Sequence, residues 1–271
     1  MLDGGTNPHG LFGSKEDEDF AQFVANIKKF TSIDLSQYKE NQMRRRLTTL
    51  RMKHGFSTFS QYYAAIVAEP RLRNEFLDRM TINVSEFWRN PNRWQVLKDR
   101  FLPELLKEQS RLNVWSAACS TGEEPYTIAM ILDSLGVLDR TSLQATDIDE
   151  GVLGKAKEGV YLERSLRDVP SDFKKYFTES DGAYKVSDNL KRAVKFQKQN
   201  LLLDRFGDKY DLIVCRNVMI YFTEEAKHML YGKFANALRP GGLLFVGSTE
   251  QIFSPGQYGF ETADTFFYRK L

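Results

Sequence analysis

The spacing of apolar and polar residues divides the chain into a helical first part and an alternating second part. From Glu16 onward, large apolar residues recur every three or four positions, which is typical of helices that bury one face. The pattern predicts four helices, at residues 16–30, 37–53, 57–67 and 70–80. These short helices leave too few residues for a sheet, so residues 16–82 are predicted to form a small all-α domain, with Met43, Leu47 and Leu50 facing inward.

After residue 109, short apolar runs alternate with amphipathic segments, which is the pattern of an α/β domain with a parallel sheet. Strands are predicted at residues 114–115, 143–146, 210–215 and 243–247, with a last pair at 260–261 and 265–269. Helices are predicted at residues 91–108, 123–135, 150–158 and 223–238. The α/β domain should therefore cover residues 109–271, after a linker segment and helix at 83–108 that should kink or break at Pro103.

A long segment separates the helix at 150–158 from the third predicted strand, which ends at Asn200 and Leu201. Within it, residues 172–177 indicate a short helix, and residues 183–186 and 193–196 indicate strands. We therefore expect an inserted antiparallel β-subdomain at about residues 161–197. Edge strands of such a subdomain can pair with a peptide of a partner protein; the alternative is a lid or loop without a partner.

Composition and charge narrow the class of protein. The chain has 271 residues, of which 42% are hydrophobic and 27% charged, as in globular proteins of one large domain or a large and a small one. The net charge of +2 gives no overall field toward nucleic acid or membranes. Because neither a signal peptide nor an apolar run of about 18 residues is found, we expect a cytoplasmic protein, with a disordered leader at residues 1–15.

The cysteine and histidine residues indicate neither disulfide bonds nor a metal site. The two cysteines, Cys119 and Cys215, provide no disulfide framework, and no Cys/His cluster has the spacing of a metal site. We therefore expect no metal, and a monomer is the default expectation.

The second predicted helix is strongly basic. Residues 39–53 contain six basic residues and one acidic residue. One interpretation is a solvated face; the other is a docking face for an acidic partner or nucleic acid. Aromatic residues are not interleaved with the charges, which counts against single-stranded nucleic acid. The candidate docking residues are Arg44, Arg45, Arg46, Arg51 and Lys53.

The stretch at residues 113–129 indicates a ligand site. An apolar strand passes through small residues into a helix that begins with Glu123, Glu124 and Pro125, which is how α/β sheets form a pocket for a nucleotide-like ligand. The stretch has one glycine and no P-loop lysine, and its two carboxylates would repel a pyrophosphate but attract a cation. S-adenosylmethionine, a cationic adenosine cofactor without phosphate, is the ligand that we expect.

Other polar residues fall where a ligand in this sheet would lie. Asp147 closes the second strand. In adenosine-binding α/β folds, an acidic residue at this place accepts hydrogen bonds from the ribose hydroxyls. Candidates also follow later strands or precede the sheet: Asn83, Ser85, Arg89, Asn200, Leu201, Arg216, Asn217 and Tyr221. Phe87 and Trp88, beside Arg89, are expected to pack between the domains.

Six segments, taken in order, resemble the chemotaxis receptor methyltransferases of the CheR type: TINVSEFWRN, WSAACSTGEEPYTIAM, ATDIDEGVL, DLIVCRNVMIYF, LRPGGLLFVGSTE and DTFFYRK. The resemblance runs from about Glu16 to the C-terminus. It implies a Rossmann-like S-adenosylmethionine-dependent methyltransferase domain with a small antiparallel β insertion, preceded by an all-α receptor-docking domain. The implied activity is esterification of glutamate side chains on the cytoplasmic helices of chemoreceptors, with S-adenosyl-L-homocysteine as product.

The resemblance also implies roles for residues. Arg89 and Tyr221 would be catalytic, the first orienting the incoming carboxylate and the second facing the methyl group. Cofactor contacts would come from Asn83, Ser85, Arg89, Glu123, Glu124, Asp147, Asn200, Leu201, Arg216 and Asn217. Ser85 stands where the family often has threonine, Glu124 is favoured over Glu123, and the inserted subdomain could bind a receptor tail peptide. A glutamate carboxylate is already ionised at neutral pH, so no general base is required.

Two alternatives remain open. One is a methyltransferase of another substrate, such as RNA or a small molecule, which the basic helix would allow. The other is a non-catalytic receptor adaptor that retains a cofactor site, against which the intact polar residues of the site motifs argue.

Overall fold

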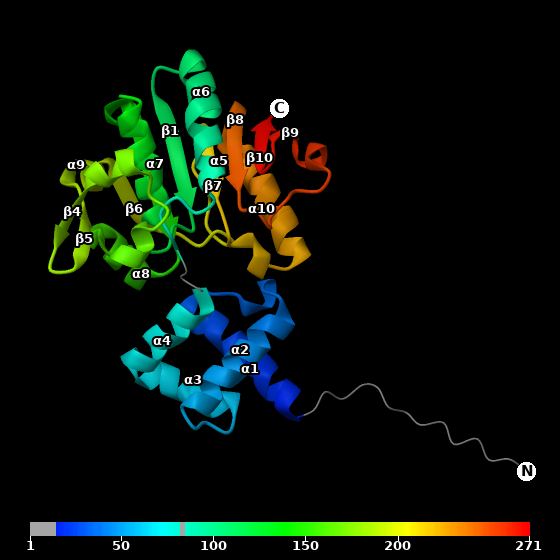
Figure 1. Ribbon diagram of the computed structural model, residues 1–271. Helices are drawn as coiled ribbons and strands as arrows, with labels where there is room; N and C mark the ends of the chain where they lie inside the picture. Colours follow the sequence, from blue (N-terminus) through cyan, green and yellow to red (C-terminus); the bar gives the residue numbers. More distant parts are fainter. Residues whose placement is uncertain (1–14, 82–84) are drawn as a thin grey trace, which may run out of the picture. The chain divides into compact units, whose positions relative to one another are not determined.

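The computed structural model describes residues 15–81 and 85–271 and divides the chain into two units, one up to Phe76 and one from Leu77 to Leu271 (Figure 1). Each unit is described by itself. Asn83, a predicted cofactor contact, lies outside the described residues.

The four predicted helices are present. Their bounds are α1 (Lys15–Thr31), α2 (Glu40–Lys53), α3 (Phe59–Ala68) and α4 (Pro70–Thr81), which crosses the division after Phe76. The second helix begins later than expected because Asp34 caps a separate 3₁₀ turn, η1 (Leu35–Gln37), by accepting from the Ser36 N–H. Thr58 caps α3 by accepting from the N–H of Gln61.

Aromatic and aliphatic side chains form the core of the helical unit. Phe23 packs on Phe59 and, edge-on, on Phe76, at ring distances of 5.2 and 6.1 Å. The three residues of α2 predicted to face inward, Met43, Leu47 and Leu50, are buried.

The second unit contains a seven-stranded sheet in the order β6-β2-β1-β7-β8-β10-β9. Five strands are parallel: β1 (Leu112–Ala117), β2 (Thr141–Asp147), β6 (Val194–Lys198), β7 (Tyr210–Cys215) and β8 (Leu238–Val246). The chain ends in the antiparallel pair β9 (Phe260–Asp264) and β10 (Phe267–Lys270). The predicted fold, an all-α domain before an α/β domain with a small antiparallel insertion, is confirmed.

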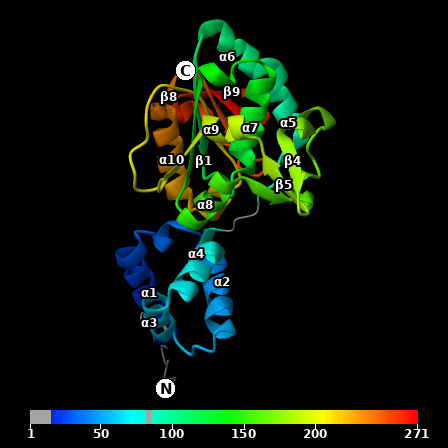
Figure 2. The ribbon, with the colours of Figure 1, turned by 90° about the vertical axis from the view of Figure 1, so that its left-hand side faces the viewer.

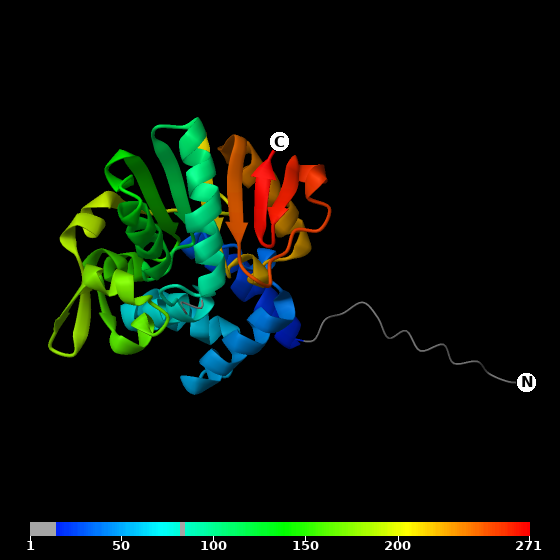
Figure 3. The same cartoon turned by 45° about the horizontal axis from the view of Figure 1, so that its top comes forward.

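Helices cover both faces of this sheet. α5 (Pro91–Val96) and α6 (Leu102–Glu108) lie on one face, and α10 (Glu224–Ala237) lies on the other (Figure 2 and Figure 3). The irregularity that Pro103 predicts is a π-helical segment, η2 (Leu97–Phe101), which leaves Pro103 in the first turn of α6, where its missing N–H costs little. α7 (Glu123–Ser134), α8 (Glu150–Glu158) and α9 (Asp188–Ala193) complete the α-helices of the described part of this unit.

The inserted subdomain differs from the prediction. Its sheet consists of β3 (Val160–Leu162), β5 (Ala183–Val186) and β4 (Phe177–Ser180), all antiparallel. The assignment of residues 193–196 to this sheet is wrong, because Ala193 ends α9 and the other three belong to β6, which pairs with β2 in the large sheet and ends at Lys198. The expected helix at 172–177 is a 3₁₀ helix, η5 (Ser171–Tyr176), after η4 (Glu163–Leu166).

The remaining 3₁₀ turns of the described chain are η3 (Leu138–Arg140), η6 (Met219–Tyr221) and η7 (Pro255–Tyr258). Of the helices that the structure describes, none is long and apolar enough to cross a membrane.

Candidate active site

The strand order reverses between β1 and β7. The chain runs from β1 to β2 and β6 on one side, and then from β7 to β8 on the other. In open α/β sheets a crevice forms outside the carboxyl ends of the strands at such a point, and ligands bind there. Glu124 lies in the first turn of α7 after β1, Asp147 is the last residue of β2, and Arg216 directly follows β7, so all three main candidates lie at this edge.

The loop between β1 and α7 needs small residues. Ala118, Ser120 and Gly122 have φ angles of 58°, 50° and 97°. A Cβ on Gly122 would lie 2.9 Å from the Cβ of Ala156 on α8, closer than real Cβ atoms approach other atoms. The loop therefore packs directly on α8, and only a glycine permits that approach with this backbone conformation.

The two adjacent carboxylates have different surroundings. Glu123 is 4% exposed, accepts from the Thr121 hydroxyl at 2.6 Å and is hydrogen-bonded to Ser85. Glu124 accepts from the hydroxyl of Ser116 at 2.8 Å, and its side chain is 13% exposed. Glu123 thus joins the Ser85 segment to α7, while Glu124 is the carboxylate of the pair that is more accessible to a ligand.

Burial changes the acidity of the site. It raises the pKa of Glu124 to about 7, against the opposing charge of Arg216. It also raises the pKa of Asp147 to about 6. The Asp147 carboxylate accepts from the N–H of Ser120 at 2.8 Å and of Asp149 at 3.0 Å, so it joins the loop after β1 to the turn after β2. The Ile148 N–H also donates to this carboxylate, which leaves about one of its four lone-pair positions for a ligand hydroxyl.

Arg216 lies in the interior, with a side chain 4% exposed. One terminal nitrogen donates at 2.8 Å to both the Arg89 carbonyl and the Asn90 side chain, and the other lies 3.9 Å from the Glu124 carboxylate. The guanidinium also stacks over the Trp94 ring, 5.0 Å from its centroid. Its contacts in the structure are those of a group that positions Arg89 and Glu124, and its contact with the cofactor stays a prediction. The charge of Arg89 lowers the pKa of Glu124, so the two lie close.

Aromatic side chains anchor the segment before Arg89. The ring of Phe87 lies 4.8 Å from that of Tyr161 in β3, and the ring of Trp88 lies 4.5 Å from that of Phe173 in η5. Both side chains are buried in the core of the α/β unit, where they pack against the inserted segment. The chain segment before Arg89 is therefore part of that core and not a simple linker.

Asn200 and Leu201 follow β6 by two residues. The Asn200 side-chain oxygen accepts from the Leu202 N–H at 3.0 Å, and Leu201 is 7% exposed. Lys233 of α10 donates to the Leu201 carbonyl at 2.6 Å. The predicted adenine contacts are therefore part of a well-bonded turn.

The loop after β7 carries Asn217, with a φ of 60°, and a half-buried Tyr221 at the end of η6. The backbone of this loop donates three N–H groups to Glu250, a residue that the sequence analysis did not identify as a candidate. The available signal was an acid shortly after the buried strand β8, at the same edge of the sheet as the other candidates.

Three of the five docking candidates on α2 are paired within the helical unit. Arg51 is 8% exposed, stacks over the Phe59 ring at 4.5 Å and lies 3.7 Å from Glu16. Arg44 pairs with Asp17 at 2.6 Å. The acidic partners come from α1, so the charge excess of α2 is smaller in the fold than in its own sequence.

The third paired candidate is Lys53, whose ammonium lies 2.6 Å from Glu75 on α4. Arg45 is exposed and Arg46 is half-buried. Because its side chain is exposed, Arg45 is the better candidate of these two for contact with an acidic partner.

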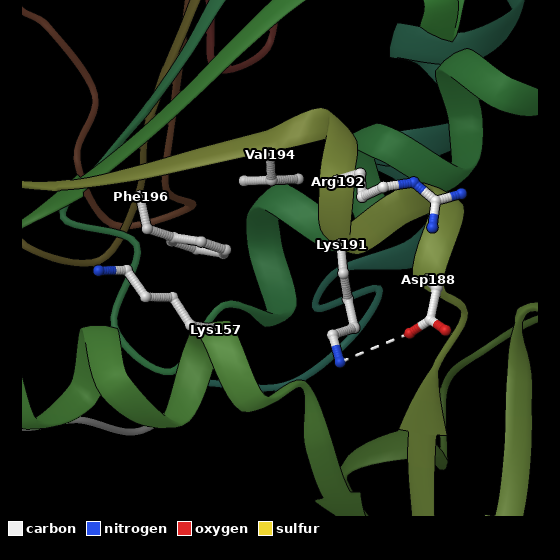
Figure 4. A pocket seen from close by; sticks show the side chains of 6 residues that line it. All are labelled: Lys157, Asp188, Lys191, Arg192, Val194 and Phe196. Carbon is white, nitrogen blue, oxygen red and sulfur yellow. Dashed lines mark ion pairs between the residues drawn. The ribbon is translucent and has the colours of Figure 1, made fainter.

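A basic cleft lies within the α/β unit, between α8, α9 and β6. Its volume is about 300 Å³, and Figure 4 shows Lys157 and Lys191 beside it. Both lysines stand in the last turn of their helices, where a positive charge complements the helix dipole. Among the residues described, no cluster of acidic, histidine or cysteine side chains could hold a metal ion.

The donor set fits S-adenosylmethionine. Glu124 offers a partly accessible carboxylate for a cationic group, Asp147 has a lone pair for a hydroxyl, and the loop between them presents small residues. With the sheet order, this defines the unit as an S-adenosylmethionine-dependent methyltransferase of Rossmann-like fold.

The chain belongs to the CheR methyltransferase family. Residues 83–267 match its SAM-binding domain, and residues 18–81 match its all-alpha domain. A chemotaxis protein methyltransferase of Listeria innocua is 40% identical over 94% of this chain and 98% of its own length. One of Vibrio parahaemolyticus is 36% identical over 87% of this chain and 90% of its own. Among solved structures, the glycopeptide N-methyltransferase MtfA is a distant neighbour, with 14% identity, a TM-score of 0.35, and coverage of 56% of this chain and 52% of its own.

Proposed function

We propose that the protein methylates glutamate side chains on the cytoplasmic helices of bacterial chemoreceptors, giving glutamyl methyl esters. The observation that carries this proposal is the match of both domains to one family, with relatives named chemotaxis protein methyltransferases over nearly their whole length. The protein would act in the cytoplasm and be recruited to receptors at the membrane.

S-adenosylmethionine, when bound, supplies an electrophilic methyl group on a sulfonium. The chain's own task is then to position donor and acceptor and to exclude water, because a carboxylate acceptor is already ionised. Glu124 would hold the cationic methionine end, and Asp147 would accept from a ribose hydroxyl. Arg89 would orient the incoming carboxylate, Tyr221 would face the reacting methyl, and Arg216 would position Arg89 and Glu124.

Further residues would contact the cofactor. Ser85, Asn200, Leu201 and Asn217 would complete the cofactor site, as would Asn83 outside the described residues. Because Glu123 is buried and already hydrogen-bonded, we favour Glu124 as the cofactor contact of the two.

Receptor docking would use α2. Arg45, whose side chain is exposed, would meet the acidic surface of the receptor helices together with Arg46. The open edges of the three-stranded sheet could take a receptor tail peptide by strand addition.

The test is methyl transfer from radiolabelled S-adenosylmethionine to a chemoreceptor cytoplasmic fragment, followed by mild alkali. Volatile methanol released from the receptor is the expected result, because glutamyl esters are base-labile. A receptor fragment with its methylatable glutamates replaced by alanine is the control. Label that withstands alkali, or cofactor binding without label on several receptors, would contradict the proposal.

A further inference from the structure

Glu250 binds backbone from two loops at the carboxyl edge of the sheet. Its side chain is buried, and its carboxylate accepts four backbone N–H groups. One oxygen accepts from Gly247 at 2.8 Å and Asn217 at 2.6 Å; the other accepts from Val218 at 2.8 Å and Met219 at 2.7 Å. Three consecutive amides that point to one side form an anion-binding concavity, which the chain fills with its own carboxylate.

These hydrogen bonds set the conformation of the loop after β7. Asn217 has a left-handed φ of 60°, a conformation that asparagine tolerates better than most non-glycine residues and that directs its N–H toward Glu250 together with the next two amides. Met219 then begins the turn η6, which ends at Tyr221 and closes with a bond from the Tyr221 N–H to the Val218 carbonyl at 3.2 Å. The position of Tyr221 therefore depends on where Glu250 holds the preceding amides.

The arrangement requires a carboxylate in this place. Four donors converge on two oxygens, so the amide of a glutamine would direct its own N–H₂ at backbone N–H groups. Burial raises the pKa of Glu250, and the four N–H groups act in the opposite direction. Gly247 leaves the necessary space: a Cβ there would lie 2.4 Å from a Glu250 oxygen and 2.9 Å from the Asn217 nitrogen.

We propose that Glu250 is a positioning residue for methyl transfer, which acts through Tyr221 on the chemical step rather than on cofactor affinity. This inference rests on the proposed function. Because Glu250 is buried beneath the loop, it makes its contribution without touching either reactant.

The test is a double-mutant cycle with Glu250→Gln and Tyr221→Phe, read as kcat, receptor KM and the Kd of S-adenosylhomocysteine. Glu250→Gln alone should lower kcat about 10- to 100-fold, as expected for a displaced reacting group, and change Kd less than about threefold. In the Tyr221→Phe background the same change should lower kcat far less, because both act through one side chain. Independent, multiplying effects, or a Kd that weakens as much as kcat falls, would overturn the inference.

A second variant guards against simple misfolding. Gly247→Ala displaces the carboxylate without removing it and should reproduce the kcat loss, while Gly256→Ala, where a Cβ meets nothing within 4 Å, should not. Equal kcat values for these two variants would also overturn the inference. Wild-type protein that fails to methylate receptors would instead overturn the proposed function and, with it, this role.

Discussion

The raised pKa of Glu124 predicts that cofactor affinity depends on pH in the neutral range. Because burial raises this pKa to about 7, the carboxyl is largely protonated at pH 6 and largely ionised at pH 8. A cationic methionine end binds the ionised form. If binding requires that form, the apparent Kd should fall about tenfold from about pH 6 to about pH 8, with proton release on binding near neutrality.

Calorimetric titration of the protein with S-adenosylmethionine at several pH values measures this effect, and two buffers of different ionisation enthalpy at each pH reveal the released protons. Glu124→Gln is the matched variant, because it retains the size of the side chain and an acceptor for Ser116 but cannot ionise. It should bind more weakly and lose most of the pH dependence. The pKa of Asp147, about 6, should leave only a smaller slope at the acidic end.

The raised pKa of Glu124 also makes folding stability depend on pH, with the opposite direction to cofactor affinity. An unfolded glutamate has a pKa near 4.5, so between that value and about 7 the folded protein holds the proton more tightly. The free energy of unfolding of the ligand-free protein should therefore fall as pH rises through this window, and less so in Glu124→Gln. A wild-type Kd that is flat from pH 6 to 8, or an equal slope in the variant, would refute the assignment of Glu124 to the cofactor.

Three further predictions follow from single residues. Arg45→Glu should raise the receptor KM several-fold without changing the cofactor Kd. Lys29→Glu on α1 makes the same charge change and is the control, which should leave the receptor KM unchanged. Equal KM values for the two variants would mean that the basic face of α2 is only solvated and does not dock the receptor. Arg89→Ala and Tyr221→Phe should each lower kcat more than they weaken cofactor binding, and parallel losses in both would contradict their catalytic roles. Gly122→Ala should lower the free energy of unfolding by about 1–3 kcal/mol, measured by denaturant titration, since φ is 97° and the new Cβ would collide with α8; unchanged stability would contradict that packing.

Local patterns predicted the elements whose signals lie within one segment. The helix at 150–158 coincides with α8, because Asp149 caps its start and Gly159 ends it in a left-handed conformation. The buried run at 210–215 coincides with β7. A strand was correctly predicted near residues 193–196, where β6 begins at Val194, but it was placed in the wrong sheet. The choice of pairing partner is a property of the whole chain and not of its local pattern.

The site shows the same division between local and tertiary information. The sequence located Glu124, Asp147, Arg216 and Tyr221 at one edge of the sheet, but it could not separate Glu123 from Glu124. These two neighbours differ only in what packs against them. Burial of Arg51 beneath the ring of Phe59 was equally invisible, since its partners come from other helices.

The packing of Phe87 and Trp88 couples ligand binding at the inserted subdomain to ligand binding at the candidate active site. These rings rest on Tyr161 and Phe173, and the next residue is Arg89. A ligand that shifts the small sheet would change the placement of Arg89, whose charge acts on Glu124, and through Glu124 it would change the affinity for the cofactor. Since such coupling is reciprocal, the cofactor would change that ligand's affinity by the same factor. A peptide on the subdomain and the cofactor could therefore regulate each other without sharing a single contact.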